Sequence, residues 1–94
     1  MKKFFYRVQK GDGLLALSET LSVPVGVIIK LNALTAEPTE GDILYLERDA
    51  RLKIYTVGVT DTAESLAQEY ATTPEKILKD NAVDYLFYGL KIYL

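Results

Sequence analysis

Few residues in this chain could do covalent chemistry, and the most suggestive group is Gly11, Asp12 and Gly13, which precede an apolar, helix-like pattern. The sequence has no histidine and no cysteine, which excludes the commonest zinc ligands, cysteine nucleophiles and a Ser-His-Asp triad. A phosphate loop would continue with lysine and serine or threonine, but leucines follow here. A calcium loop would need carboxylates at alternating positions, and no acid follows Asp12 until Glu19. We therefore predict no catalytic group, metal or cofactor; Gly11 should form a tight turn and Asp12 should cap the next helix.

The composition is that of an ordinary globular protein, and it argues against several classes of partner. Hydrophobic residues make up 49% of the 94 residues and charged residues 26%. The net charge is -2 and the basic residues are scattered, so we expect no nucleic-acid partner. Arg7, Gln9, Lys10 and Asp12 interrupt any signal-peptide core. No apolar run approaches the roughly 20 residues of a membrane span. We expect a soluble protein without a membrane partner, and without the converging acids of a glycosidase.

The chain repeats itself with a shift of 49 residues. Among the superimposed segments are residues 6–8 on 55–57 and residues 30–33 on 79–82. A shift of 48 then places Gly41 on Gly89, so the single length difference falls in a loop, which tolerates it. The join, residues 47–53, is short and highly charged, as a solvated connection would be. We predict two units, 1–49 and 50–94, with the boundary near Ala50.

Each unit should contain a strand, two helices and a strand, which gives an α+β protein made of two βααβ units. The opening strands are expected around residues 4–9 and 53–58, and the closing strands at residues 43–46 and 91–94. Period-two alternation then places four apolar residues on the sheet faces away from the helices: Phe5, Tyr45, Ile54 and Tyr93. An apolar outer face suggests either that the two units pack together or that the protein self-associates.

The helices are predicted from apolar residues at helical spacing and from their capping signals. Two equivalent stripes should be buried, namely Leu14, Leu17, Ser18 and Leu21 in the first unit and Ala63, Leu66, Ala67 and Tyr70 in the second. Asp61 and Glu64 have the spacing of a capping box. Thr73, Pro74 and Glu75 provide a cap, a proline at the first helical position and a favourable acid. Asn32 and Asn81 should end the second helices as left-handed caps.

The same ordered set of short motifs occurs in both halves of the chain. The first half contains Tyr6-x-Val8-x-x-Gly11-Asp12, Leu14-x-x-Leu17, Lys30-Leu31-Asn32-x-Leu34 and Gly41-Asp42-x-Leu44-x-Leu46. The second half contains Tyr55-x-Val57, Asp61-Thr62, Leu66-Ala67, Ile77-Leu78-Lys79-x-Asn81 and Gly89-x-x-Ile92-x-Leu94. In this order and twice over, the motifs resemble a tandem LysM protein. The resemblance implies two-stranded antiparallel sheets with two helices on one face, and binding of glycans that contain N-acetylglucosamine, such as peptidoglycan and chitin.

The resemblance also implies where a glycan would lie, in a shallow groove between the loop after the first strand and the loop before the second. In unit one these loops supply Gly11, Asp12, Gly13 and Leu14 facing Ala33, Leu34, Thr35 and Ala36. In unit two they supply Thr60, Asp61, Thr62 and Ala63 facing Val83, Asp84, Tyr85 and Leu86. Backbone amides and carbonyls would bind the N-acetyl group, and small apolar side chains would contact its methyl group and the sugar face.

The two units depart from the family pattern in different ways. The family usually has Gly-Asp-Thr, where unit one has Gly-Asp-Gly and unit two has Thr-Asp-Thr. A positive φ at Thr60 would strain a β-branched residue, so the loop of unit two should change shape, and we favour the groove of unit one. Three aromatic residues follow in unit two, Tyr85, Phe87 and Tyr88; we expect them to cover the core, with stacking on sugar rings as the alternative.

The sequence therefore predicts a non-catalytic glycan-binding protein, with bacterial peptidoglycan as the foremost ligand. One alternative is a LysM scaffold that has lost sugar binding and serves assembly in an envelope or spore layer. Another is a targeting fragment of a cell-wall hydrolase. The family suggests the cell wall or envelope, whereas the absence of a signal peptide in these residues leaves a cytoplasmic or spore location, or a piece of a longer secreted protein, open.

Overall fold

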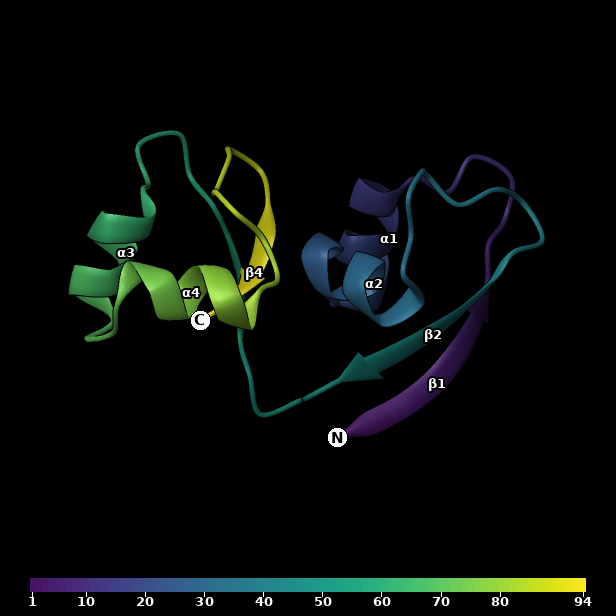
Figure 1. Cartoon of the computed structure of the whole chain (residues 1–94), viewed down its shortest axis with the longest axis horizontal. Coiled ribbons are helices and arrows are strands. Elements are labelled where there is room, and N and C mark those ends of the chain that lie inside the picture. Colours follow the sequence, from purple (N-terminus) through teal and green to yellow (C-terminus); the bar gives the residue numbers. More distant parts are fainter.

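The computed structural model describes residues 1–94 as two βααβ units in succession (Figure 1). Unit one consists of β1 (Lys2–Arg7), α1 (Leu14–Leu21), α2 (Val25–Asn32) and β2 (Ile43–Arg48). Unit two consists of β3 (Ile54–Thr56), α3 (Ala63–Glu69), α4 (Pro74–Asp80) and β4 (Lys91–Tyr93). β1 pairs with β2 and β3 with β4, both antiparallel. The predicted α+β class and the two βααβ units are confirmed, while the boundary near Ala50 stays a prediction.

Each unit has a hydrophobic core of its own between its sheet and its helices. The first core consists of Val8, Leu14, Leu17, Val23, Ile28, Leu44 and Leu46, and the second of Val57, Leu66, Ala67, Ile77, Leu90 and Ile92. Leu44, Leu46 and Ile92 lie on the predicted inward sheet faces and Leu14, Leu17, Leu66 and Ala67 on the predicted helical stripes, whereas Val23 and Leu90 lie in connections where no burial was predicted. On the stripes Tyr70 is the exception, because it follows the last turn of α3 and stays 45% exposed, with its ring edge-on to that of Tyr55. No single helix is long and apolar enough to cross a membrane, although α1 and α2 together, bent by 105°, meet the length and composition requirements.

An asparagine at the end of the second helix fastens each closing strand. The side-chain amide of Asn81 donates to the carbonyls of Ile77 and Tyr93, and its oxygen accepts from the amide of Tyr93 at 2.6 Å. Asn32 makes the same three bonds to Ile28 and Tyr45. The prediction that the asparagines are the left-handed residues is wrong: the following alanines, Ala33 and Ala82, have positive φ. The asparagine instead uses its side chain to join helix to strand.

The helix starts in unit two differ in how well local sequence predicted them. α4 begins as expected, with the Thr73 side chain accepting from the Lys76 amide and Pro74 in the first turn. In α3 the predicted capping box of Asp61 and Glu64 is wrong by one residue. Thr62 is the N-cap, and its hydroxyl and that of Ser65 each accept from the other residue's amide.

The two units pack against each other at the start of α2. A Cβ atom on Gly26 would lie only 2.2 Å from the carbonyl oxygen of Asn81 and 2.5 Å from that of Ala82, so this contact requires glycine. Val25 packs against both cores. The positive end of α2 thereby meets the negative end of α4, which is a favourable orientation of helix dipoles.

The four apolar residues of the outer sheet faces have different surroundings. Tyr93 and Ile54 line a hollow together with Ser22, Arg48 and Asp49 of unit one and its connection, so the outer face of unit two lies near the junction. Phe5 remains 72% exposed, with the Tyr45 ring 5.5 Å away. Packing between the units thus accounts for one of the two faces, and self-association through Phe5 stays a prediction.

Candidate functional site

Asp12 shapes the first loop of unit one but does not cap α1. Its Oδ2 accepts from the Tyr6 hydroxyl at 2.7 Å and from the Gln9 amide at 2.8 Å, which ties the loop back to β1. The N-cap residue of α1 is Gly13, which has no side chain to cap with. The predicted cap is therefore wrong, whereas the predicted turn is confirmed by the positive φ of Gly11, 84°. The hydrogen bond raises the pKa of Tyr6.

The helix cap of unit one comes from the opposite loop. The Leu14 amide, the first of α1, donates to Glu37 Oε2 at 2.9 Å across the predicted groove. The two predicted loops are thus brought together, and the side chain that joins them was not among the predicted residues. No local pattern marks Glu37, since its partner lies 23 residues away in the sequence.

The first loop of unit two keeps the tyrosine–aspartate contact but forms a different turn. Asp61 Oδ2 accepts from the Tyr55 hydroxyl and from the Gly58 amide. The hydrogen bond with Asp61, aided by burial and the aspartate charge, raises the pKa of Tyr55 to about 12, and the same bond lowers the pKa of Asp61. Thr60, the counterpart of Gly11, is not among the residues with positive φ. The turn type therefore changes, as expected, and Thr60 is not strained.

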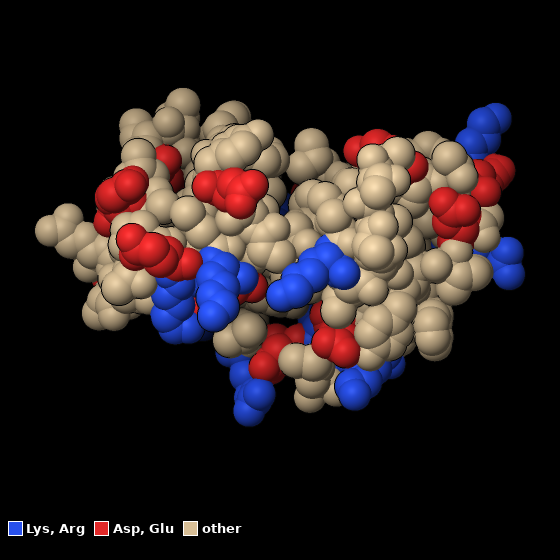
Figure 2. Space-filling view, viewed as in Figure 1, with Lys and Arg blue, Asp and Glu red and all other residues tan.

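The second loop of unit two exposes its aromatic side chains. Tyr85 is 69% exposed, Tyr88 73%, and Phe87 also faces solvent, with the Tyr85 and Phe87 rings 6.1 Å apart. The interpretation that these residues cover the core is wrong, because Leu86 fills that position instead. Val59 on the facing loop is exposed as well, and uncharged side chains cover most of the upper edge of this unit in Figure 2.

Not all predicted site residues could touch a ligand with their side chains. Leu14 is buried in the first core, so only its backbone could contribute, whereas Leu34, Val83 and Leu86 pack against the cores and stay partly exposed. The solvent-exposed ones are Gly11, Ala33, Thr35, Ala36, Thr60, Thr62, Asp84 and Tyr85. The half-buried ones are Asp12, Gly13, Asp61 and Ala63. In unit two, backbone bonds between Val57 and residues 89–90 join the loop ends, but no side chain bridges the two loops as Glu37 does in unit one.

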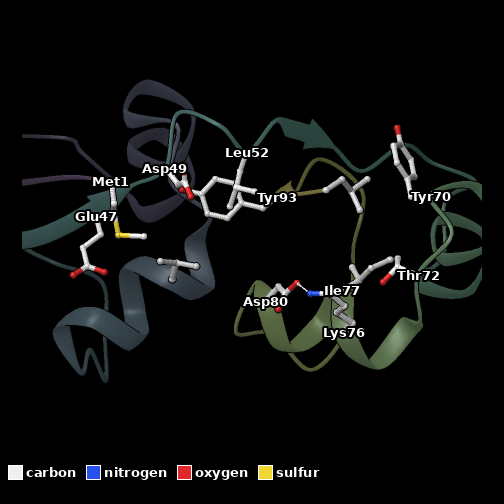
Figure 3. A pocket seen from close by; sticks show the side chains of 12 residues that line it. Met1, Glu47, Asp49, Leu52, Tyr70, Thr72, Lys76, Ile77, Asp80 and Tyr93 are labelled. Atoms are coloured by element: carbon white, nitrogen blue, oxygen red, sulfur yellow. Dashed lines mark hydrogen bonds and ion pairs between the residues drawn. The ribbon is translucent and has the colours of Figure 1, made fainter.

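A separate cavity of about 670 Å³ lies between the two units and contains none of the predicted site residues. Figure 3 shows the Tyr93 ring beside Leu52 and Asp49, and the Lys76–Asp80 pair on α4. The Tyr93 hydroxyl is buried, and burial raises the pKa of Tyr93. The hydrogen bonds from Arg51 lower the pKa of Asp49 to about 2. No group of three or more His, Cys, Asp or Glu side chains is arranged to hold a metal ion.

Comparison with protein families decides what unit two is. The model of the LysM domain matches residues 55–92, from the middle of β3 to the middle of β4. Unit two is a LysM domain. Unit one repeats its element order, its Tyr–Asp contact and its strand-fastening asparagine, so the predicted tandem of LysM units is confirmed.

Comparison with solved structures finds two enzymes to which this chain is similar. The spore cortex-lytic enzyme SleL of Bacillus megaterium QM B1551 is 23% identical, with a TM-score of 0.45 over 96% of this chain and 22% of that one. The SleL enzyme of Bacillus cereus is 20% identical, with a TM-score of 0.48 over 99% of this chain and 23% of that one. This chain thus spans less than a quarter of either enzyme. No curated protein matches significantly.

Proposed function

We propose that this chain binds glycans containing N-acetylglucosamine, foremost bacterial peptidoglycan, and that it does so without chemistry. The observation that carries the proposal is the match of unit two to the LysM domain, a non-catalytic module typical of peptidoglycan binding. An association with the cell wall or envelope follows from the same family. Chitin is a second ligand of the same chemistry.

The candidate sites are the grooves between the paired loops of each unit, and unit two is the one that we expect to bind in the wild type. In unit one the residues are Gly11, Asp12, Gly13 and Leu14 opposite Ala33, Leu34, Thr35 and Ala36; in unit two they are Thr60, Asp61, Thr62 and Ala63 opposite Val83, Asp84, Tyr85 and Leu86. Backbone groups would bind the N-acetyl amide, as expected for loops in which several side chains face the core. The exposed rings of Tyr85 and Tyr88 offer apolar faces to sugar rings, which supports a role for unit two.

A heteronuclear NMR titration with the pentamer of N-acetylglucosamine tests this function, with cellopentaose as the control sugar. We expect saturable shifts of backbone amides in residues 58–63 and 82–88 with the first sugar only. Tyr85→Ala should weaken binding roughly threefold to tenfold, because it removes an aromatic contact. Phe5→Ala removes an equally exposed ring from the outer sheet face and should leave the affinity unchanged. A flat response of both units, or equal shifts with cellopentaose, would exclude the proposal.

A second candidate is an assembly module that binds protein rather than sugar. The observation that favours it is the outer face of unit one, where the exposed Phe5 ring lies 5.5 Å from the half-buried Tyr45 ring at a tilt of 58°. A targeting role for a cell-wall hydrolase is compatible with either candidate. Analytical ultracentrifugation of the wild type and Phe5→Lys tests assembly through this face. If the protein self-associates through Phe5, the oligomeric mass of Phe5→Lys should be lower than that of the wild type.

A further inference from the structure

The two LysM units differ in what occupies the groove when no ligand is bound. In unit one the Glu37 carboxylate lies on the Leu14 amide at 2.9 Å, at the start of α1. A Cβ atom on Gly13 would lie 3.9 Å from the same carboxylate oxygen, so the acid sits directly over the loop that precedes the helix. Its bond is charge-assisted and lies at the positive end of a helix dipole, both of which strengthen it relative to a bond with a neutral acceptor.

A sugar N-acetyl group is such a neutral acceptor, and it would compete for this amide. The oxygen of an N-acetyl carbonyl carries no charge, so it gains less from the helix end than the carboxylate does. Peptidoglycan strands that carry carboxylates would, in addition, be repelled by Glu37. The Glu37 side chain therefore competes with a glycan for the Leu14 amide.

Unit two has no such competitor. The helix α3 is capped by its own Thr62 and Ser65, and the positions that correspond to Glu37, Tyr85 or Leu86 depending on the shift, are not acidic, while the neighbouring Asp84 makes no side-chain hydrogen bond. Backbone hydrogen bonds between Val57 and residues 89–90 close the ends of its two loops, but no side chain of one loop bonds to the other. The groove of unit two is thus free of an internal ligand.

We propose that Glu37 closes the groove of unit one to glycans and that unit two is the sugar-binding unit of the pair. Glu37 acts as a specificity-determining residue: it excludes acidic glycans from unit one and admits a neutral one only when it leaves the Leu14 amide. This inference rests on the proposed glycan-binding function.

The test is the same NMR titration with N-acetylglucosamine pentamer, carried out on the intact chain with three variants. Glu37→Ala removes the competitor, and Glu37→Gln keeps its length without its charge. Glu40→Ala is the matched control. Glu40 is an exposed acid of the same loop, and its side chain makes no hydrogen bond, so the variant removes the same charge without breaking a contact. The Leu14 amide resonance reports directly whether the bond to Glu37 has been lost.

In the wild type and in Glu40→Ala, shifts should be confined to unit two. Glu37→Ala should add saturable shifts at residues 11–14 and 33–36, with binding to unit one at least about tenfold tighter than in the wild type. The affinity of unit one in Glu37→Gln should lie between those of the wild type and Glu37→Ala. If Glu37→Ala destabilises α1, the affinity of Glu37→Gln tests the role of the charge instead. Equal binding of unit one in the wild type and the variants, or no binding of unit one in any of them, would overturn the role of Glu37. Silence of unit two in every protein would instead overturn the assignment of unit two, whatever Glu37 does.

Discussion

At the residue scale, each unit is fixed by two side chains that reach beyond their own segment. A tyrosine of the first strand donates to the aspartate of the following loop, and an asparagine of the second helix bonds the closing strand. The residue types at 12, 32, 61 and 81 were all noticed in the sequence, but as local caps. Their partners in the strands lie 6 to 13 residues away, which is beyond the three or four residues that a helix cap spans.

The Tyr55–Asp61 bond should make stability depend on pH in a defined window. The pKa of Tyr55 rises from 10.0 to about 12, so the stabilisation is complete below pH 10 and is lost as the pH rises through 12. The lowered pKa of Asp61 adds stabilisation that is present at neutral pH and is lost as the pH falls through its folded-state pKa. The stability difference between the wild type and Tyr55→Phe should therefore shrink between pH 9 and pH 12.

Urea unfolding at pH 7, 9 and 11.5 checks this dependence. Tyr88→Phe is the matched control, since that hydroxyl has no hydrogen-bond partner and its ring is exposed. A difference between wild type and Tyr55→Phe that stays constant over this range would show that the bond does not control the titration of Tyr55.

At the element scale, the success of the sequence prediction depended on how local each signal is. α4 was predicted down to its cap because Thr73 and Pro74 act within one turn. The start of α3 was misplaced because the Asp61 carboxylate accepts a hydrogen bond from the Tyr55 hydroxyl, so Thr62 rather than Asp61 caps the helix. The cap of α1 could not be predicted, since Glu37 comes from the far side of the groove. The fold follows from periodicity and repetition, whereas the groove depends on contacts between loops.

The revised cap of α3 gives a direct comparison of two substitutions. Thr62→Ala removes the side chain that accepts from the Ser65 amide, and it should lower the free energy of unfolding by about 1 kcal/mol. Glu64→Gln, at the position of the predicted capping box, should cost only about 0.3 kcal/mol through the helix dipole. Denaturant unfolding measures both. A larger loss for Glu64→Gln would restore the original prediction.

At the scale of the whole molecule, the contact at Gly26 sets how the two LysM units face one another. In Figure 1 the loops that precede α1 and α3 both lie along the upper edge of the molecule, so the first loops of the two units lie on the same side. From the sequence alone, Gly26 is only an unfavourable residue within a helix. Its reason lies in the carbonyl oxygens of Asn81 and Ala82, more than 50 residues further along the chain.

Gly26→Ala should therefore open the junction while both cores stay folded. The added carbon must move by about 1 Å to clear the carbonyls, which should cost about 2 kcal/mol of interface energy against about 1 kcal/mol gained in helix propensity. We expect NMR shifts at residues 81–83 and, in small-angle scattering, a radius of gyration larger than that of the wild type. Gly13→Ala has space for its methyl group and negative φ, and should change neither. Unchanged resonances at residues 81–83 in Gly26→Ala would contradict this account of the junction.

The same contact makes the docking of the two LysM units directional. The start of the second helix in unit one meets the end of the second helix in unit two, which is a head-to-tail interface of the kind that could continue indefinitely between identical repeats. Unit two carries Glu75 at the position that corresponds to Gly26, so its own second helix cannot approach another pair of carbonyls as closely. This docking geometry can consequently occur once between these two units and cannot propagate beyond them.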